Sequence, residues 1–270
     1  MQITSALLIA ALIAVLGAAA LGTAAAAVRR PALLSTAYWA LVLGAAFLLV
    51  ALVVRAAVAG RAPWTNLHET AVTFAFALAA VYLAMDRRLA IRRLVPVVSL
   101  LCAGLAWLAL AQPNEVMPLV PALQSPVLLT VHVGSAMLAY AIGGVAFAAA
   151  AAEIVQRRAA DRLSALPSAG VARIAAHRAI LLGFPVLTAA IVLGAVWANL
   201  AWRSYWSNDP KELAAAATWL VYGGYLHVAT RRDRWGELAP WLLVAGFAGV
   251  LFTYLGAGLV FVGEHSYAGA

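Results

Sequence analysis

The residues of this sequence best suited to chemistry are its five histidines: His68, His132, His177, His227 and His265. Neutral imidazole is a common metal ligand, and its charge state changes readily near neutral pH. Serine, cysteine and acidic residues show no spacing that predicts a nucleophile beside its base, or a pair of carboxylates sharing a proton. The residue types therefore favour metal or ligand binding over hydrolysis.

A second candidate is the segment 202–212, which reads Trp-Arg-Ser-Tyr-Trp-Ser-Asn-Asp-Pro-Lys-Glu. Aromatic rings at a membrane surface commonly anchor helices, which would account for two or three of these rings. Anchoring does not account for their alternation with cations, acids and an amide. Flat apolar faces beside hydrogen-bond donors suit a planar, hydrophobic ligand that carries carboxylates. The candidate ligand-binding residues are Trp197, Trp202, Tyr205, Trp206, Asn208, Asp209, Lys211 and Glu212.

The composition requires lipid as the main solvent of the chain. Of its 270 residues, 66% are hydrophobic and 10% are charged, against roughly 25% charged in soluble domains. The formal net charge of +8 does not indicate a nucleic-acid partner, because the basic residues form short clusters between apolar runs. The single cysteine, Cys102, lies within an apolar run and is expected to be a buried, inert thiol.

Apolar stretches of about 20 residues predict helices that cross a bilayer. The sequence contains eight of them, and the fold class expected is an all-α integral membrane protein of about eight spans. The first stretch resembles the cleavage region of a signal peptide, but it lacks a basic start and is followed by arginines, which favours a retained helix. The stretches are 3–28, 34–59, 68–85, 94–112, 127–152, 178–200, 212–230 and 238–262.

The arginines predict the orientation of these spans. Fourteen of the 18 basic residues lie in alternate connections, which the positive-inside rule assigns to the cytoplasm. Both termini and the segment 202–212 are then extracytoplasmic, and connection 153–177 is long enough for a short interfacial helix. Abundant alanine and arginine favour a bacterial plasma membrane. The fourteen are Arg29, Arg30, Arg87, Arg88, Arg92, Arg93, Arg157, Arg158, Arg162, Arg173, Arg178, Arg231, Arg232 and Arg234.

This orientation divides the histidines between the two faces. His132 lies about 8 Å inside the outer boundary of its span, and His265 follows the last span on the same face. His227 lies within span seven near the cytoplasmic side, where a helix–helix hydrogen bond is the alternative to a functional role. His177 is expected in a cytoplasmic connection, and His68 begins span three beside a helix-capping group.

In this arrangement the sequence resembles the CcsA (ResC) family, whose members are the haem-handling subunits of the System II cytochrome c synthase. The resemblance rests on 183–188, 194–199, the segment 202–212 and the closing 265–267. It covers 63–69, the His132 span and nearly everything from Arg178 onward. Asn208 replaces a tryptophan of the family signature, and His68 replaces a tyrosine.

The resemblance implies one polytopic domain, with two N-terminal helices (1–60) and a haem-handling core (61–270). His132 and His265 would ligate haem iron outside, segment 202–212 would cradle the haem b as the "WWD" signature, and His227 would receive haem from the cytoplasmic side. The reaction implied attaches haem to a Cys-x-x-Cys-His apocytochrome c and is enzymatic only in complex with CcsB (ResB). Thioredoxin-like proteins would keep the substrate cysteines reduced.

Three alternatives remain open at this point. A haem export or delivery protein of the System I type would share the histidines and the tryptophan-rich segment but form no covalent bond. A b-type electron-transfer subunit would need paired histidines at matched depth. A transporter of another substrate would bind no haem.

Overall fold

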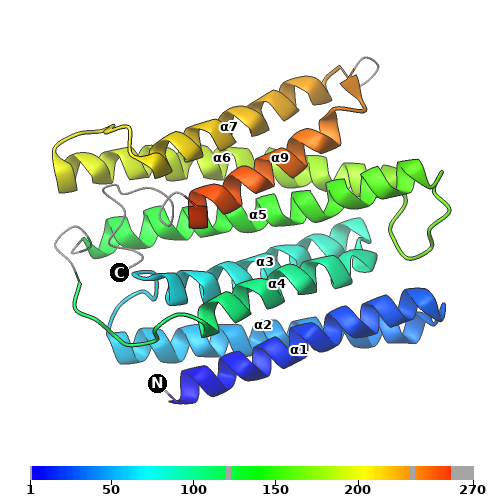
Figure 1. Ribbon diagram of the computed structural model, residues 1–270, viewed down its shortest axis with the longest axis horizontal. Coiled ribbons are helices and arrows are strands. Elements are labelled where there is room, and N and C mark those ends of the chain that lie inside the picture. Colours follow the sequence, from blue (N-terminus) through cyan, green and yellow to red (C-terminus); the bar gives the residue numbers. More distant parts are fainter. Residues whose placement is uncertain (1, 120–122, 124, 232–234, 257–270) are drawn as a thin grey trace.

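The structure is a computed structural model of the chain that describes residues 2–119, 123, 125–231 and 235–256. All regular secondary structure within this part is helical, as predicted. The long helices run nearly side by side (Figure 1). They are α1 (Gln2–Ala27), α2 (Pro31–Ala59), α3 (Leu67–Leu89), α4 (Val95–Leu110), α5 (Pro126–Arg158), α6 (Ala169–Trp202), α7 (Pro210–Ala229) and α9 (Ala239–Leu251).

Seven helical segments are long and apolar enough to cross a membrane, and they comprise every long helix except α7. The short 3₁₀ turn η1 (Arg92–Leu94) extends α4, and the π-helical turn η3 (Phe252–Gly256) extends α9. Helix α7 has 20 residues, with Lys211 and Glu212 in its first turn and His227 in its last. The described residues thus contain eight long helices, in agreement with the predicted number.

The connection between α5 and α6 differs from the prediction. Helix α5 continues to Arg158, and α6 already begins at Ala169, where the hydroxyl of Ser168 accepts a hydrogen bond from the Val171 N–H. The nine residues that were expected in a loop or a separate interfacial helix are therefore the first turns of α6. His177 lies inside this helix, where its Nδ1 is 3.3 Å from the hydroxyl of Tyr225.

Small side chains allow the helices to approach closely, as expected for helix packing in lipid. Helix α5 packs along α6, α1 packs along α2, and α3 lies against both α4 and α5. Alanine is the most frequent buried residue of the described part, and Phe74, Tyr82 and Tyr225 are its largest fully buried side chains. Cys102 is completely buried, as predicted.

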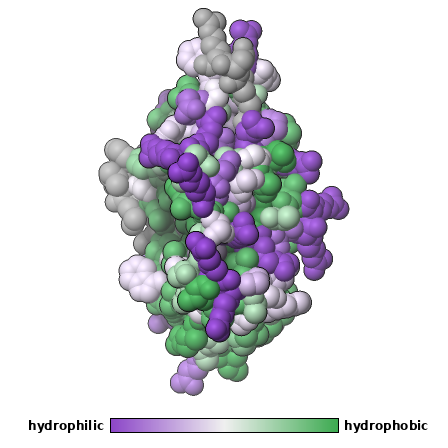
Figure 2. Space-filling model, turned by 90° about the vertical axis from the view of Figure 1, so that its right-hand side faces the viewer, coloured by the Kyte–Doolittle hydropathy of each residue, from purple (hydrophilic) through white to green (hydrophobic). Residues whose placement is uncertain are grey.

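The helix connections gather at two ends of the bundle. The turns α1–α2, α3–α4 and α5–α6 lie at one end (right in Figure 1), and hydrophilic side chains concentrate on that face (Figure 2). This end carries the predicted cytoplasmic arginines that the structure describes; Arg232 and Arg234 lie outside the described residues. The connection between α6 and α7 lies at the opposite end, which we call the outer end.

Candidate functional site

A cavity of about 240 Å³ opens at the outer end between α3, α5, α6, the α6–α7 connection and η3. Seven of the predicted ligand-binding residues line it: His132, Trp197, Trp202, Tyr205, Trp206, Lys211 and Glu212. We call this cavity the outer pocket. The aromatic segment and the histidine of α5 thus meet at one place, as the sequence predicts.

The imidazole of His132 is held against α6. Its Nδ1 lies 2.9 Å from the carbonyl oxygen of Ala190. A carbonyl can only accept, so Nδ1 carries the proton and Nε2 of the neutral ring carries the lone pair. A Cβ at Gly194 would lie 2.7 Å from His132 Cε1, so only glycine leaves room for the ring. Trp197 meets the ring edge to face, with centroids 5.5 Å apart. The ring therefore has a fixed tautomer and orientation.

The α6–α7 connection is closed by helix caps at both ends. Arg203 ends α6 in the left-handed conformation, and its N–H donates to the Asn199 carbonyl. Asp209 and Glu212 form a capping box at the start of α7. The Glu212 carboxylate also accepts the N–H of Ser207 at 2.8 Å. Glu212 therefore lines the pocket with a carboxylate that already has partners within the loop.

Asn208 and Asp209 do not line the outer pocket. Asp209 is a buried capping residue. Asn208 is exposed and adopts φ = 60°, a backbone conformation that asparagine tolerates better than most side chains. Its Oδ1 accepts a hydrogen bond of 2.8 Å from the indole of Trp206. In this chain Asn208 thus shapes the loop and orients a pocket tryptophan.

Lys211 places an amino group at the pocket wall. Burial lowers the pKa of this amino group below its ordinary value, and the carboxylate of Asp209 opposes part of that shift. An ammonium group beside aromatic rings is suited to pair with a carboxylate of an apolar ligand.

The structure adds pocket residues beyond the predicted ligand-binding set. Tyr140 and Tyr254 line the pocket, with their ring centroids 6.4 Å apart. The hydroxyl of Tyr254 lies 3.1 Å from that of Thr70 on α3. Trp64, Thr65 and Asn66 form a further wall. The available signal for this wall was a tryptophan two residues before Asn66, the N-cap of α3.

Two further histidines that the structure describes, His227 and His68, do not line the pocket. His227 is exposed in the last turn of α7, at the end opposite the pocket. His68 is buried, with Nδ1 2.8 Å from the Ala109 carbonyl. His265 lies outside the described residues.

The eight long helices of the described residues and the histidine-bearing, aromatic pocket define a polytopic membrane protein with a cavity at one end of the bundle. Residues 6–265 match the family described as "Cytochrome C assembly protein". The "Cytochrome c biogenesis protein CcsA" of Guillardia theta is 34% identical, with 77% of each chain covered. That of Synechococcus elongatus is also 34% identical, over 77% of this chain and 80% of its own. The chain belongs to the CcsA family.

The fold is also that of a solved structure, "Cytochrome c Heme Lyase CcmF". The superposition has a TM-score of 0.72 at 20% sequence identity and covers 94% of this chain. It covers 46% of the other chain, so this chain spans about half of that protein's length. The likeness establishes the shared helical arrangement.

Proposed function

We propose that this chain acts in cytochrome c biogenesis as the haem-handling subunit of a System II synthase, and that its substrate haem b binds in the outer pocket. The observation that carries the proposal is the state of His132, an imidazole whose tautomer leaves the lone pair on Nε2, in a pocket walled by aromatic rings. Imidazole nitrogen is a common axial ligand of haem iron.

The other pocket residues would orient the porphyrin. Aromatic faces of Trp64, Trp197 and Trp202 offer an apolar surface for a flat ring. Lys211 would pair with a propionate carboxylate. His265, which the family resemblance matches to a second outer ligand, would complete the coordination of the iron.

The chemical step proposed is addition of two apocytochrome thiols to the two haem vinyl groups. In each addition the sulfur bonds to one vinyl carbon, and the thiol proton is transferred to the other, so no external oxidant or reductant is consumed. The contribution of this chain would be proximity and orientation of the vinyl edge. CcsB, the apocytochrome and thiol-reducing thioredoxin-like proteins are the partners proposed.

His227 has a separate proposed role in receiving haem. It is exposed on α7 near the arginine-rich end, so its imidazole is accessible to a haem bound between this chain and CcsB. This places haem uptake and haem presentation at opposite ends of the bundle. The predicted orientation makes the arginine-rich end cytoplasmic and the outer pocket extracytoplasmic, in the bacterial plasma membrane.

The test is maturation of a reporter cytochrome c in cells that express this chain with CcsB. His132→Ala should abolish both haem in the purified complex and the covalent reporter. His177→Ala is the matched control, because it removes an imidazole that contacts Tyr225 outside the pocket. Normal maturation by His132→Ala would refute the ligand assignment. Haem retained without a covalent reporter in the wild-type complex would instead favour a System I type delivery protein.

A further inference from the structure

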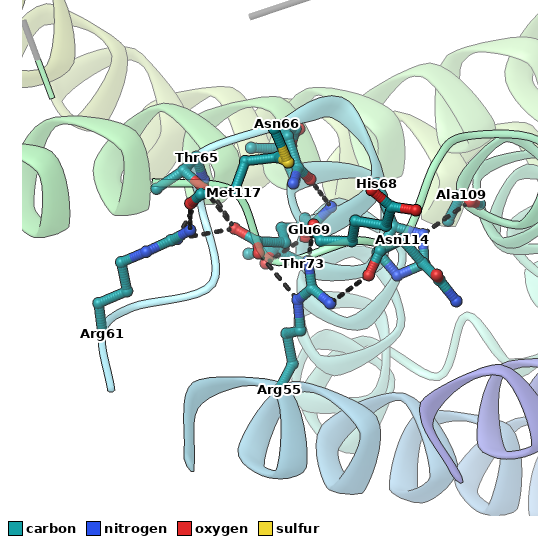
Figure 3. Close-up of polar contacts among 12 residues, drawn as sticks. Arg55, Arg61, Thr65, Asn66, His68, Glu69, Thr73, Ala109, Asn114 and Met117 are labelled. Atoms are coloured by element: carbon teal, nitrogen blue, oxygen red, sulfur yellow. Dashed lines mark hydrogen bonds and ion pairs between the residues drawn. The ribbon is translucent and has the colours of Figure 1, made fainter. Parts of the chain in front are cut away.

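The first turn of α3 contains a buried carboxylate, Glu69 (Figure 3). Leu67 and Thr70 of the same turn line the outer pocket. The side chain of Glu69 is fully buried, and Oε1 accepts a hydrogen bond of 2.9 Å from Arg55 Nε. Oε2 lies 3.4 Å from Arg61 Nη1 and accepts the N–H and the hydroxyl of Thr65, both at 2.9 Å. We call the cluster of Glu69, Arg55, Arg61 and Thr65 the brace. One donor thus reaches Oε1 and three reach Oε2, which fixes the geometry of the carboxylate.

The brace also holds the connection between α4 and α5. Arg55 donates from Nη1 to the Asn114 carbonyl at 2.5 Å and from Nη2 to the Glu115 carbonyl at 2.9 Å. Arg61 donates to the Met117 carbonyl at 3.2 Å. One carboxylate therefore organises two arginines that bind residues within 113–119, a stretch without regular secondary structure (Figure 3).

A chain of contacts leads from the brace to His132. Thr65 belongs both to the brace and to the pocket wall. The indole of its neighbour Trp64 lies over Gly134 of α5, where an added Cβ would be 3.1 Å from Cη2 and 3.2 Å from Cζ3 of the ring. Gly134 is two residues from His132 on the same helix. Displacement of residues 64–65 would therefore release the surface against which the outer end of α5 rests.

We propose that Glu69 is a positioning residue of the outer pocket, which acts through Thr65 and Trp64 to hold the outer end of α5 and the His132 imidazole in place for iron. The inference rests on the proposed function. An ion cluster that served stability alone would have no effect on iron ligation beyond the loss of folded protein.

The test compares Glu69→Gln with a matched control, Asp86→Asn. Asp86 is also buried on α3 and pairs with an arginine, at 3.2 Å, but it lies in the last turn, away from the pocket. In haem-free protein, hydrogen exchange at 63–66 and 111–119 should rise in Glu69→Gln and stay unchanged in Asp86→Asn. This readout requires no bound haem.

In the haem-loaded protein, Glu69→Gln should lose haem about tenfold faster, at the low end of the roughly 10- to 100-fold effects of outer-shell changes at metal sites. Its spectrum should shift from six-coordinate low-spin toward high-spin iron, and added imidazole should restore it. Asp86→Asn should retain the wild-type spectrum. Unchanged haem retention and spectrum in Glu69→Gln would overturn the inference.

Two further outcomes are also decisive. If Glu69→Gln does not accumulate, Thr65→Val removes a single hydroxyl from the brace and should speed haem loss by a smaller factor; a wild-type rate would overturn the inference. If the wild-type protein binds no haem, the proposed function fails. Hydrogen exchange then still decides whether Glu69 holds the pocket wall.

Discussion

The two ends of α3 contain buried carboxylates with opposite surroundings. Glu69, in the first turn, lies where the helix dipole favours a negative charge, and it has two arginines and Thr65 as partners. Asp86, in the last turn, lies where the dipole opposes its charge. It pairs with the half-exposed Arg92, and its Oδ1 has no hydrogen-bond partner among the described residues.

The two ends of the bundle therefore use their arginines differently. At the outer end, arginine side chains point inward to a carboxylate and to backbone carbonyls, and the pocket forms beside them. At the other end, hydrophilic side chains gather on the surface (Figure 2), and Arg87, Arg88, Arg92 and Arg93 are exposed. Burial of a paired charge is costly. Four donor groups offset this cost at Glu69, whereas one donor from the described residues, Arg92 Nε, reaches the Asp86 carboxylate.

The largest effect is expected from Gly194→Leu at the outer end. Because a Cβ at this position already overlaps the His132 ring, a bulky side chain should displace the imidazole and remove haem from the purified protein. Gly104→Leu on α4 is the control, since no atom lies within 4 Å of an added Cβ there. Haem binding by folded Gly194→Leu protein at the wild-type level would show that the ring position is not required.

The next effect concerns stability of the two carboxylate sites. Loss of one partner of a buried pair costs on the order of 3 kcal/mol, so Glu69→Gln should lower the thermal unfolding midpoint clearly. Asp86→Asn should cost about 1 kcal/mol or less, because Arg92 is 46% exposed and remains solvated. Thermal unfolding in detergent measures both. Equal losses would remove the distinction between the two ends.

A smaller effect is expected from the protonation of Lys211, which should make stability and haem affinity depend on pH. Burial lowers the pKa of Lys211 in the folded protein, so the unfolded state binds its proton more tightly. Folding is therefore opposed below the lowered pKa, and this penalty disappears as pH rises toward the ordinary lysine value. The charge that pairs with a propionate is lost over the same interval.

Haem affinity of the wild type should accordingly fall as pH rises through the lowered pKa, by about tenfold for one charge-assisted hydrogen bond. Lys211→Arg should keep its haem affinity to higher pH, and Lys211→Gln should bind haem weakly at every pH. Haem titrations at several pH values measure this. The same profile in wild type and Lys211→Gln would exclude Lys211 from carboxylate binding.

The smallest effect is expected at Asn208. Asn208→Gly keeps the positive φ but removes the acceptor of the Trp206 indole. Both lie at the exposed loop, so haem affinity should fall about twofold, in line with roughly 0.5 kcal/mol for an exposed hydrogen bond. Asn208→Ala also adds backbone strain, so its haem affinity should fall further. A larger loss in the glycine variant than in the alanine variant would contradict this account.

The helical membrane fold was predictable because each span is a long apolar run. The start of α6 was not, because Arg173 and Arg178 at its exposed surface resemble a loop in composition while Ser168 supplies the cap. Which alanine-rich helix faces pack together could not be predicted either, because hydropathy along the chain does not specify contacts between helices.

The site was predictable in part. The types and positions of His132, Trp197 and the aromatic segment indicated one outer pocket, and seven of their side chains line it. Asn208 and Asp209 were predicted to bind the ligand because they lie within the same segment, but neither lines the pocket. Asp209 caps α7, and Asn208 accepts a hydrogen bond from the Trp206 indole. The contribution of Trp64 depends on its contact with Gly134 of α5, and that of Glu69 on its contacts with Arg55, Arg61 and Thr65. Spacing along the chain does not reveal these contacts.

The most direct test of the central claim is electron paramagnetic resonance of ferric haem in the purified wild-type complex, His132→Ala and His177→Ala. We predict a low-spin signal in wild type and His177→Ala, and its loss in His132→Ala with recovery on adding imidazole. An identical low-spin signal in all three proteins would show that His132 does not bind the iron, and the outer pocket would then have another ligand.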